Sequence, residues 1–351
     1  MDPYTRFKNT KYFDALDGLR AISILAVVWH HSSHTEHGWL SRGYLGVQLF
    51  FAISGVLITT LLLRERERKG QVALKEFYIR RTLRIFPLYY AVIALYFALV
   101  WLTERNTERG HAFFHHLPAF LTYTSNWFVS LGAGSSVIFY FAWSLATEEQ
   151  FYLFWPSVIR FSRRWVGPTI VMTLVLLAGE SARWARAHQL VPPDLLMVKV
   201  LASIATSICL GSLCAVLLHY RAGFNFAYRM AGQNWSVIVA LVLLALTFTL
   251  QAPDIWVALV MVYVVACCVV REDHALRRVL ANRGARYIGS ISYGMYLLHV
   301  LALNIVRKVV GRDVGDIGLF AATTVLAIAA ASLSYYTFEK PFLNLKKRFA
   351  S

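Results

Sequence analysis

The sequence predicts an all-α membrane protein, a polytopic bundle of about ten transmembrane helices. Of its 351 residues, 58% are hydrophobic and only 15% are charged. A soluble domain carries about 25% charged residues, so this composition excludes an ordinary soluble enzyme. The apolar residues also gather in runs that approach the roughly 20 residues needed to cross a bilayer. The loops between the runs are short, so we expect residues 1–351 to form a single domain.

The first run, Ala21 to Trp29, follows basic residues as the core of a signal peptide would. Asp14 and Asp17 precede it, however, and no small-residue cleavage site follows, which indicates a retained first helix. The ten expected spans are, in order, residues 19–34, 44–63, 85–103, 138–159, 166–180, 197–218, 235–251, 254–270, 287–306 and 317–338.

Residues 117–131 form a shorter apolar segment that contains Pro118, Ser125 and Asn126. About 15 residues suit a re-entrant or interfacial segment better than a full crossing. The charge distribution agrees with this interpretation, because lysine and arginine collect in cytoplasmic loops. With ten spans and both termini cytoplasmic, 26 of the 35 lysines and arginines lie inside, whereas an eleventh crossing would give 18 and 17. The same distribution explains the net charge of +16 without nucleic-acid binding.

Two polar residues on the first span are candidates for a catalytic role. Arg20 and His31 are 11 residues apart, which places them on the same helix face about 16 Å from each other. A neutral imidazole is a suitable general base for a hydroxyl acceptor, so His31 is the candidate base. His30 is a competing base, but its side chain projects roughly 80° away from the direction of Arg20 around the helix axis. Alternatively, both histidines mark where the helix meets water.

A basic run precedes the third span. Arg81 and Arg84 share a helix face at the cytoplasmic boundary, with Arg80 beside them, and guanidinium groups bind phosphates in a bidentate manner. A phosphorylated cytosolic donor is therefore one interpretation. The alternative is that the arginines serve topology and contact anionic lipid.

Two adjacent acids, Glu148 and Glu149, lie near the outer end of the fourth span. Acids there are not needed for topology and are costly against lipid, so we expect them to face the bundle, toward His31 or Arg20. A carboxylate would then fix the tautomer of the base. The alternative is an acid pair at the start of a helix, where negative charge suits the helix dipole.

Ser292, Tyr296 and His299 form one polar stripe on the ninth span. They either line the same cavity or hydrogen-bond neighbouring helices together. The four cysteines lie in apolar runs without metal-type spacing, so we expect neither disulfides nor a metal site.

Together these segments resemble the acyltransferase 3 family of integral membrane acyltransferases. The resemblance covers nearly the whole chain. It is carried by residues 16–22 with the histidine 11 positions after the arginine, and by residues 46–55, 81–87, 143–152, 292–299 and 338–342.

The resemblance implies transfer of an acyl group, most often acetyl, from cytosolic acyl-CoA to a hydroxyl of a surface carbohydrate, glycolipid or related acceptor. It implies that Arg20 and His31 are essential and that Arg81 and Arg84 take part in acyl-donor use. It also implies an integral protein of the bacterial cytoplasmic (inner) membrane, in contact with membrane lipid. Some members carry a fused SGNH-hydrolase-type domain, which we expect this chain, ending at Ser351, to lack.

The mechanism we expect therefore has three parts. The CoA phosphates rest on Arg80, Arg81 and Arg84, and His31 removes the acceptor proton. Glu148 or Glu149 orients the imidazole, Arg20 stabilises negative charge, and Ser292, Tyr296 and His299 contact the substrate. The alternatives are a transporter or exporter of an acylated glycan or small metabolite, whose buried His, Glu and Arg form a proton relay, or a noncatalytic scaffold.

Overall fold

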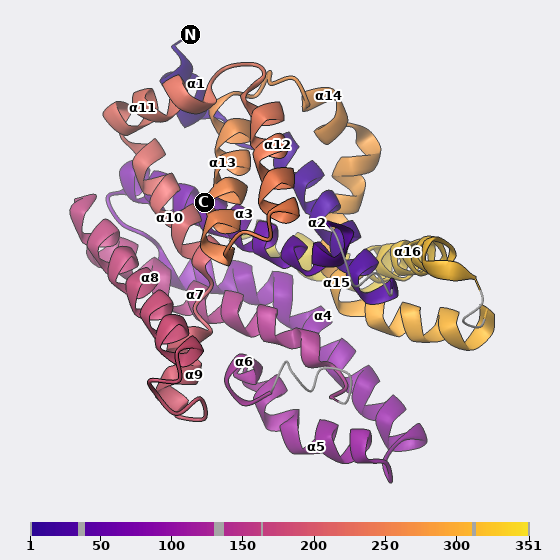
Figure 1. Cartoon of the computed structure of the whole chain (residues 1–351). Coiled ribbons are helices and arrows are strands. Elements are labelled where there is room, and N and C mark those ends of the chain that lie inside the picture. The colour runs from indigo at the N-terminus through magenta and orange to yellow at the C-terminus, as the bar shows by residue number, and fades with distance from the viewer. Residues whose placement is uncertain (1, 34–38, 130–136, 163, 311–313, 350–351) are drawn as a thin grey trace. The chain divides into compact units, whose positions relative to one another are not determined.

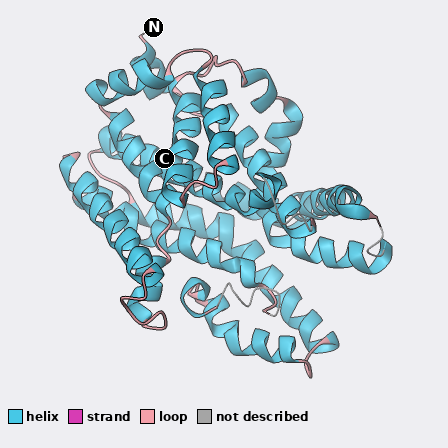
Figure 2. Ribbon diagram, in the orientation of Figure 1, coloured by secondary structure: helices cyan, strands magenta, loops and turns pink. Residues whose placement is uncertain are grey.

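The computed structural model describes residues 2–33, 39–129, 137–162, 164–310 and 314–349. Helices are the regular structure throughout these residues, with no strand among them, as the sequence predicts (Figures 1 and 2). The chain divides into two compact units. Unit 1 comprises Met1–Arg68 and Ser207–Lys340, and unit 2 comprises Lys69–Thr206 and Pro341–Ser351. The expectation of a single domain stays a prediction.

Helices of unit 1 come from both ends of its discontinuous sequence. They are α1 (Pro3–Asn9), α2 (Asp14–Ser32), the 3-10 helix η1 (Trp39–Leu45), α3 (Gly46–Lys69), α10 (Thr206–His219), α11 (Arg221–Ala231), α12 (Ser236–Thr249), α13 (Asp254–Val270), α14 (Arg277–Leu280), α15 (Arg283–Val310), α16 (Gly315–Ser334) and the π-helix η4 (Tyr335–Glu339). Within this unit α15 packs against both α2 and α16, and α12 packs against α13.

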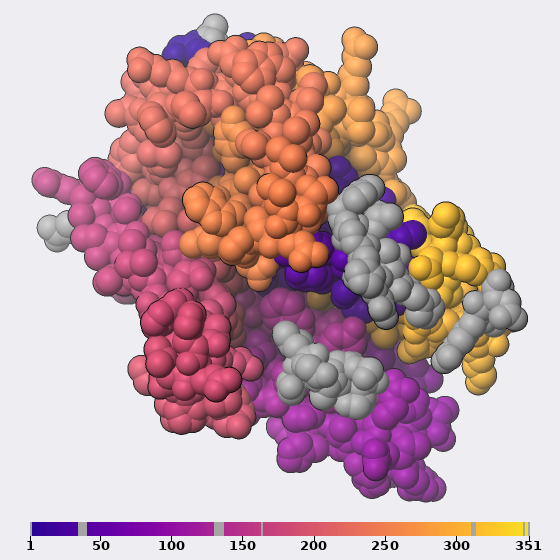
Figure 3. Space-filling view, viewed as in Figure 1, coloured from indigo at the N-terminus to yellow at the C-terminus, as the bar shows by residue number. Residues whose placement is uncertain are grey.

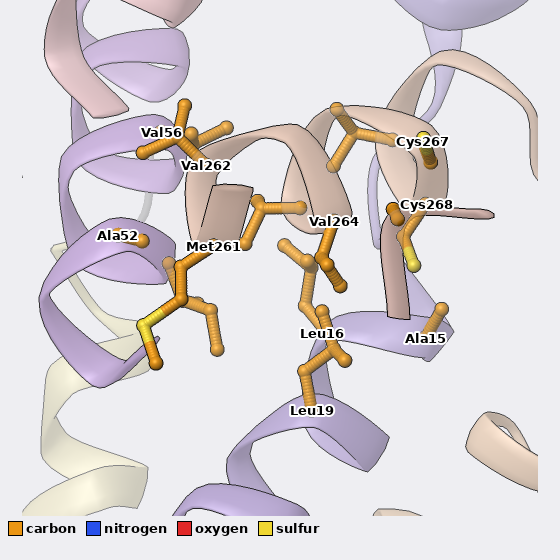
Figure 4. Close-up of a cluster of buried hydrophobic side chains, with 14 of the residues drawn as sticks. Ala15, Leu16, Leu19, Ala52, Val56, Met261, Val262, Val264, Cys267 and Cys268 are labelled. Carbon is orange, nitrogen blue, oxygen red and sulfur yellow. The ribbon is translucent and has the colours of Figure 1, made fainter. Parts of the chain in front are cut away.

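An apolar core joins α2, α3 and α13 in unit 1. Leu16 and Leu19 of α2, Ala52 of α3, and Met261 and Val264 of α13 are all buried in it (Figure 4). Cys267 and Cys268 lie in the same cluster, and none of the four cysteines, all of which are described, takes part in a disulfide. Their role here is packing, since buried cysteine behaves as a small apolar side chain.

The backbones of α14 and α15 approach that of α2 closely at two glycines, Gly18 of α2 and Gly289 of α15. A Cβ atom at Gly18 would lie 2.2 Å from the carbonyl oxygen of Leu280, and one at Gly289 would lie 2.1 Å from that of Asp17. Glycine is the residue that lets α14 and α15 approach α2 this closely. These two contacts set the position of the first turns of α2, which carry Arg20.

Unit 2 contains α4 (Leu74–Thr103), α5 (Glu108–Leu121), α6 (Ser125–Phe128), the 3-10 helix η3 (Tyr140–Ala142), α7 (Trp143–Phe161), α8 (Val166–Ala187), α9 (Leu196–Ala202) and most of α17 (Lys340–Lys347). The Tyr89 hydroxyl of α4 donates to the carbonyl of Phe120 in α5 at 2.8 Å, and the ring of Tyr89 stacks on Tyr123 at 4.3 Å. Arg183 of α8 donates to the carbonyls of Ala202 and Ile204, which joins α8 to the end of α9.

Four of the described helical segments are long and apolar enough to cross a membrane: Ser41–Lys69, Leu74–Thr103, Arg283–Val309 and Gly315–Lys346. The number rises to six if two bent pairs each count as one span, α9 with α10 and, within unit 1, α11 with α12 at 73°. Each of the ten predicted ranges is largely helical, but a total of ten crossings and the cytoplasmic position of both termini stay predictions.

The predicted re-entrant or interfacial segment, residues 117–131, forms the end of α5, a turn and the four-residue helix α6. Residues 130 and 131 lie outside the described part of the chain. No continuous helix of spanning length forms here. The helix α5 begins earlier than the apolar run, at Glu108, where the Thr107 hydroxyl accepts a hydrogen bond from the amide of Gly110 as an N-cap.

Candidate functional site

The helix α2 carries Arg20 and His31 as the sequence predicts. It is continuous from Asp14 to Ser32, so the two residues share one face about three turns apart. Their side chains are both half-buried. Arg20 and His31 thus share one helix face in the structure as the sequence predicts, whereas their chemical roles stay predictions.

A backbone contact fixes the tautomer of His31. Its Nδ1 lies 2.8 Å from the carbonyl oxygen of Val27, one turn earlier in α2. A carbonyl oxygen only accepts hydrogen bonds, so we assign the ring proton to Nδ1 and the lone pair to Nε2. His31 therefore presents Nε2 as its basic atom, which is what a general base for a hydroxyl requires.

The predicted substrate contact His299 lies directly beside the predicted base. Its ring is fully buried and meets the His31 ring edge-on, with ring centroids 4.8 Å apart. The His299 Nδ1 lies 2.6 Å from the Tyr296 carbonyl oxygen, so we assign its ring proton to Nδ1 as well. The Tyr296 ring lies 5.5 Å from His299 and 6.5 Å from Phe50 of α3. The structure thus brings together one residue of the first predicted cluster and two of the polar stripe.

Ser292, the third residue of the stripe, has a local role. Its hydroxyl donates to the carbonyl of Gly289 at 2.8 Å within α15, and its side chain is buried. This contact satisfies the hydroxyl inside its own helix, as Ser often does when it lies mid-helix. A substrate contact for Ser292 stays a prediction.

The partner of Arg20 is a residue that the sequence analysis did not select. Arg20 donates to the Asp17 carboxylate at 2.8 Å, and the Tyr12 hydroxyl donates to the same carboxylate. Asp17 is only 4% exposed. The ion pair orients the Arg20 guanidinium and offsets its charge. The sequence does contain a signal for this pair, because Asp17 and Arg20 are three residues apart and such pairs share a helix face.

Arg307 is a second residue near the base that the sequence did not reveal. It extends from the last turns of α15 and donates to the backbone carbonyl of His31 at 3.3 Å. Arg307 lies in the expected outer loop after the ninth span, and no sequence pattern there indicates a contact with His31. The contact holds the end of α2 against α15, at the turn that presents the imidazole.

The predicted donor arginines lie together on α4 in unit 2. Arg81 lies over the Tyr152 ring of α7, with its guanidinium carbon 4.2 Å from the ring centroid. Arg80 donates to the carbonyl of Phe349 at 2.8 Å, and Arg84 is exposed. Lys346 of α17 lies within electrostatic range of all three arginines and adds a fourth cation that the sequence analysis missed.

Glu148 and Glu149 lie close to these arginines. The Tyr152 hydroxyl donates to Glu148, and Tyr152 is the residue on which Arg81 stacks. Glu149 lies within electrostatic range of Arg81. Glu148 is therefore the acid that a shared contact, Tyr152, links to Arg81. The predicted action of both acids on the imidazole of His31 or on Arg20 stays a prediction.

No group of three or more His, Cys, Asp or Glu side chains is arranged to hold a metal ion within the described residues.

Comparison with known proteins identifies the family. A family model described as an acyltransferase domain matches residues 13–336. This chain belongs to the acyltransferase 3 family. The family is one of acyltransferases, and this membership together with the apolar helices makes the chain an integral membrane protein. The enzyme interpretation is therefore favoured over a transporter or a scaffold.

Curated relatives align with nearly the whole chain. The peptidoglycan O-acetyltransferase OatA of Listeria monocytogenes is 28% identical over 377 residues, which covers 98% of this chain and 58% of the relative. The protein named "Putative O-acetyltransferase SACOL0978" of Staphylococcus aureus is 27% identical over 373 residues, which covers 97% of this chain and 58% of the relative. The chain thus spans less than two thirds of the length of these relatives. No solved structure is significantly similar to it.

Proposed function

We propose that this acyltransferase moves an acetyl group from acetyl-CoA to a hydroxyl of a cell-surface carbohydrate, in the bacterial cytoplasmic membrane. The family supports the acyl transfer, and the relatives named as O-acetyltransferases support acetyl as the group and oxygen as its acceptor atom. One relative is named for peptidoglycan, which supports a polymeric sugar as the acceptor class.

The observation that carries this proposal is the pair of imidazoles formed by His31 and His299. Both rings direct Nδ1 at a backbone carbonyl, and their centroids lie 4.8 Å apart. The two histidines lie on facing helices, and each ring is held in the same tautomer. This arrangement suits proton transfer, whereas a purely structural role would need only one hydrogen-bonded ring.

In the proposed reaction His31 Nε2 takes the proton of the acceptor hydroxyl while the oxygen attacks the thioester carbonyl carbon. A C–O bond forms and the C–S bond breaks, and the departing CoA thiolate then receives the proton held by His31. The Arg307 contact and the Val27 contact keep the imidazole in place through both transfers. His299 and Tyr296 contact the acceptor, and Ser292 supports them from one turn away.

The donor phosphates bind to the arginines of α4 in this proposal. Arg80, Arg81 and Arg84 lie on one helix end, and guanidinium groups grip phosphate oxygens in pairs. The Tyr152 ring under Arg81 and the carboxylates of Glu148 and Glu149 restrict where the Arg81 guanidinium lies. Arg20, held by Asp17, supplies hydrogen-bond donors to negative charge on the donor.

The experiment is a comparison of two neighbouring histidine variants in purified, detergent-solubilised protein. His31→Gln should lower the rate of CoA thiol release in the presence of a carbohydrate acceptor by about 100-fold or more, because a general base contributes on the order of 10²–10⁴. His30→Gln is the matched control, since His30 is exposed and projects about 100° away on the same helix. A His31→Gln variant that is folded and transfers at the wild-type rate would remove the proposed base.

A single-turnover reaction with labelled acetyl-CoA and no acceptor tests the route of the acyl group. Direct transfer predicts that no label stays on the protein. Label that is retained on the wild type and lost in His31→Gln would instead indicate an acyl-histidine intermediate.

A further inference from the structure

The surface of α11 divides into three sectors around the helix. At 100° per residue, the sector at about 0–80° holds Arg221, Asn225 and Arg229, and the sector at about 100–180° holds Ala222, Phe226 and Met230. Every one of these six residues is exposed. The remaining sector, which contains the buried Phe224 and Ala231, packs on the rest of unit 1.

The buried sector is held firmly. Phe224 packs against Tyr4 and Phe7 of α1, with ring centroids 5.4 and 5.3 Å away, and it stacks on Tyr228 one turn later. The outward direction of the other two sectors is therefore fixed by packing. In Figure 1 α11 lies at the edge of unit 1, and Figure 3 shows the corresponding coral surface uncovered on this face.

The exposed apolar residues are large. Phe226 is 62% exposed and Met230 is 61% exposed, one turn apart on the same line. Beside them runs the basic line, in which the Arg221 side chain is 63% exposed and also pairs with Asp2 at 3.3 Å. An apolar line next to a basic line is the pattern of a helix that lies in the plane of a membrane surface.

The direction of α11 agrees with that position. It makes an angle of 73° with α12, the apolar helix that follows it. α12 exposes the apolar stripe Ile238, Val242 and Leu246, as a lipid-facing crossing does. Trp235, at the junction of the two helices, is 59% exposed, and tryptophan is enriched at the boundary between lipid and water. If α12 crosses the bilayer, α11 runs close to the membrane plane.

We propose that α11 is a lipid-binding interfacial helix, which buries Phe226 and Met230 in the cytoplasmic leaflet and binds anionic phospholipid headgroups through Arg221 and Arg229. The occupant of this surface is the membrane itself. Each arginine near an anionic surface strengthens lipid binding about fivefold, so the two together contribute roughly 25-fold.

The first test measures where α11 lies in vesicles of three parts phosphatidylcholine to one part phosphatidylglycerol. Single cysteines replace Asn225, Phe226 or Met230 in the full chain, and a water-soluble maleimide reports their accessibility. The native Cys209, Cys267 and Cys268 are buried and Cys214 is half-buried, so wild-type labelling is subtracted as background. We expect Phe226→Cys and Met230→Cys to react at least about tenfold more slowly than Asn225→Cys.

Three other outcomes would overturn the proposal. Equal and fast reaction at all three positions would place α11 in water. Equal and slow reaction, including Asn225→Cys, would place α11 inside the membrane as the first half of a bent span. Protection of Phe226→Cys and Met230→Cys that disappears on diluting the protein among vesicles would assign the surface to a second copy of the chain.

The second test measures headgroup preference in detergent by native mass spectrometry with equal phosphatidylglycerol and phosphatidylcholine. Arg229→Gln should lower the ratio of bound phosphatidylglycerol to phosphatidylcholine about fivefold, and adding Arg221→Gln should lower it further. Arg186→Gln, an exposed arginine on α8, is the matched control and should leave the ratio unchanged. An unchanged ratio in the double variant would refute anionic lipid binding by α11.

Discussion

Replacing Gly289 by alanine should show how strongly the α2–α15 contact controls the Arg20 site. A Cβ atom there would lie 2.1 Å from the carbonyl oxygen of Asp17, whereas ordinary van der Waals contact begins at 3.4 Å. The two backbones must therefore separate by about 1.3 Å at a point where no flexible side chain can yield. Overpacking of this kind costs about 3 kcal/mol, which corresponds to a fall in melting temperature of about 4 °C for a chain of 351 residues.

The same separation should reduce activity beyond the loss of stability. The displaced residue is Asp17, whose carboxylate holds Arg20 at 2.8 Å and accepts from Tyr12. A displacement of about 1 Å in a positioning group can lower the rate about 100-fold. The assays are thermal unfolding in detergent, followed by tryptophan fluorescence, and acetyl transfer measured well below the melting temperature.

Gly284→Ala is the matched control on the same helix. Its added Cβ would meet one atom, the Asn282 side-chain oxygen at 3.3 Å, so we expect a change in unfolding free energy within about 0.5 kcal/mol and normal activity. If Gly289→Ala melted and transferred acetyl like Gly284→Ala, close packing of α2 on α15 would not be what positions Arg20.

Two further predictions concern unit 1 away from the proposed chemistry. His274 is buried with neither ring nitrogen hydrogen-bonded to the described residues, and burial, aided by a nearby arginine, lowers its pKa below the ordinary value of 6.5. The unfolded chain then binds the proton more readily, so stability should fall as pH drops below about 6.5, and His274→Phe should flatten this slope in pH-dependent melting curves. Arg64 donates to the carbonyls of Thr10 and Phe7 and lies 5.0 Å from the Phe7 ring centroid, so Arg64→Lys should release the N-terminal helix. That loss should cost about 1.5–3 kcal/mol and appear as faster hydrogen exchange in residues 3–10, while unchanged exchange would contradict it.

Single helices and their faces could be predicted from this sequence. Apolar runs locate α2, α3, α12, α13, α15 and α16 because burial in lipid or protein requires continuous apolar sequence. The placement of Arg20 and His31 on one face followed from helix geometry alone, since both lie in one uninterrupted helix.

Contacts between helices could not be predicted in the same way. The meeting of His31 with His299 joins positions 268 residues apart, and periodicity within one helix says nothing about which partner it faces. The stacking of Arg81 on Tyr152 joins α4 to α7 for a similar reason. The 73° turn between α11 and α12 was also missed, because the sequence marks the break with polar Gln233 and Asn234 but does not encode the angle.

The charge arrangement of the two units indicates a division of tasks in the proposed reaction. In unit 1 the Arg20 charge is offset by Asp17, and the two imidazoles beside each other share the neutral Nδ1–H tautomer assigned from their carbonyl contacts. Two neutral imidazoles held at backbone carbonyls suit a proton carrier, because a neutral ring nitrogen can accept a proton and later return it. In unit 2 the three arginines of α4 and Lys346 gather near one another, and four cations suit a site for phosphates. Variants of unit 1 should therefore act mainly on kcat, and charge-removing variants of the α4 arginines should act mainly on KM for acetyl-CoA.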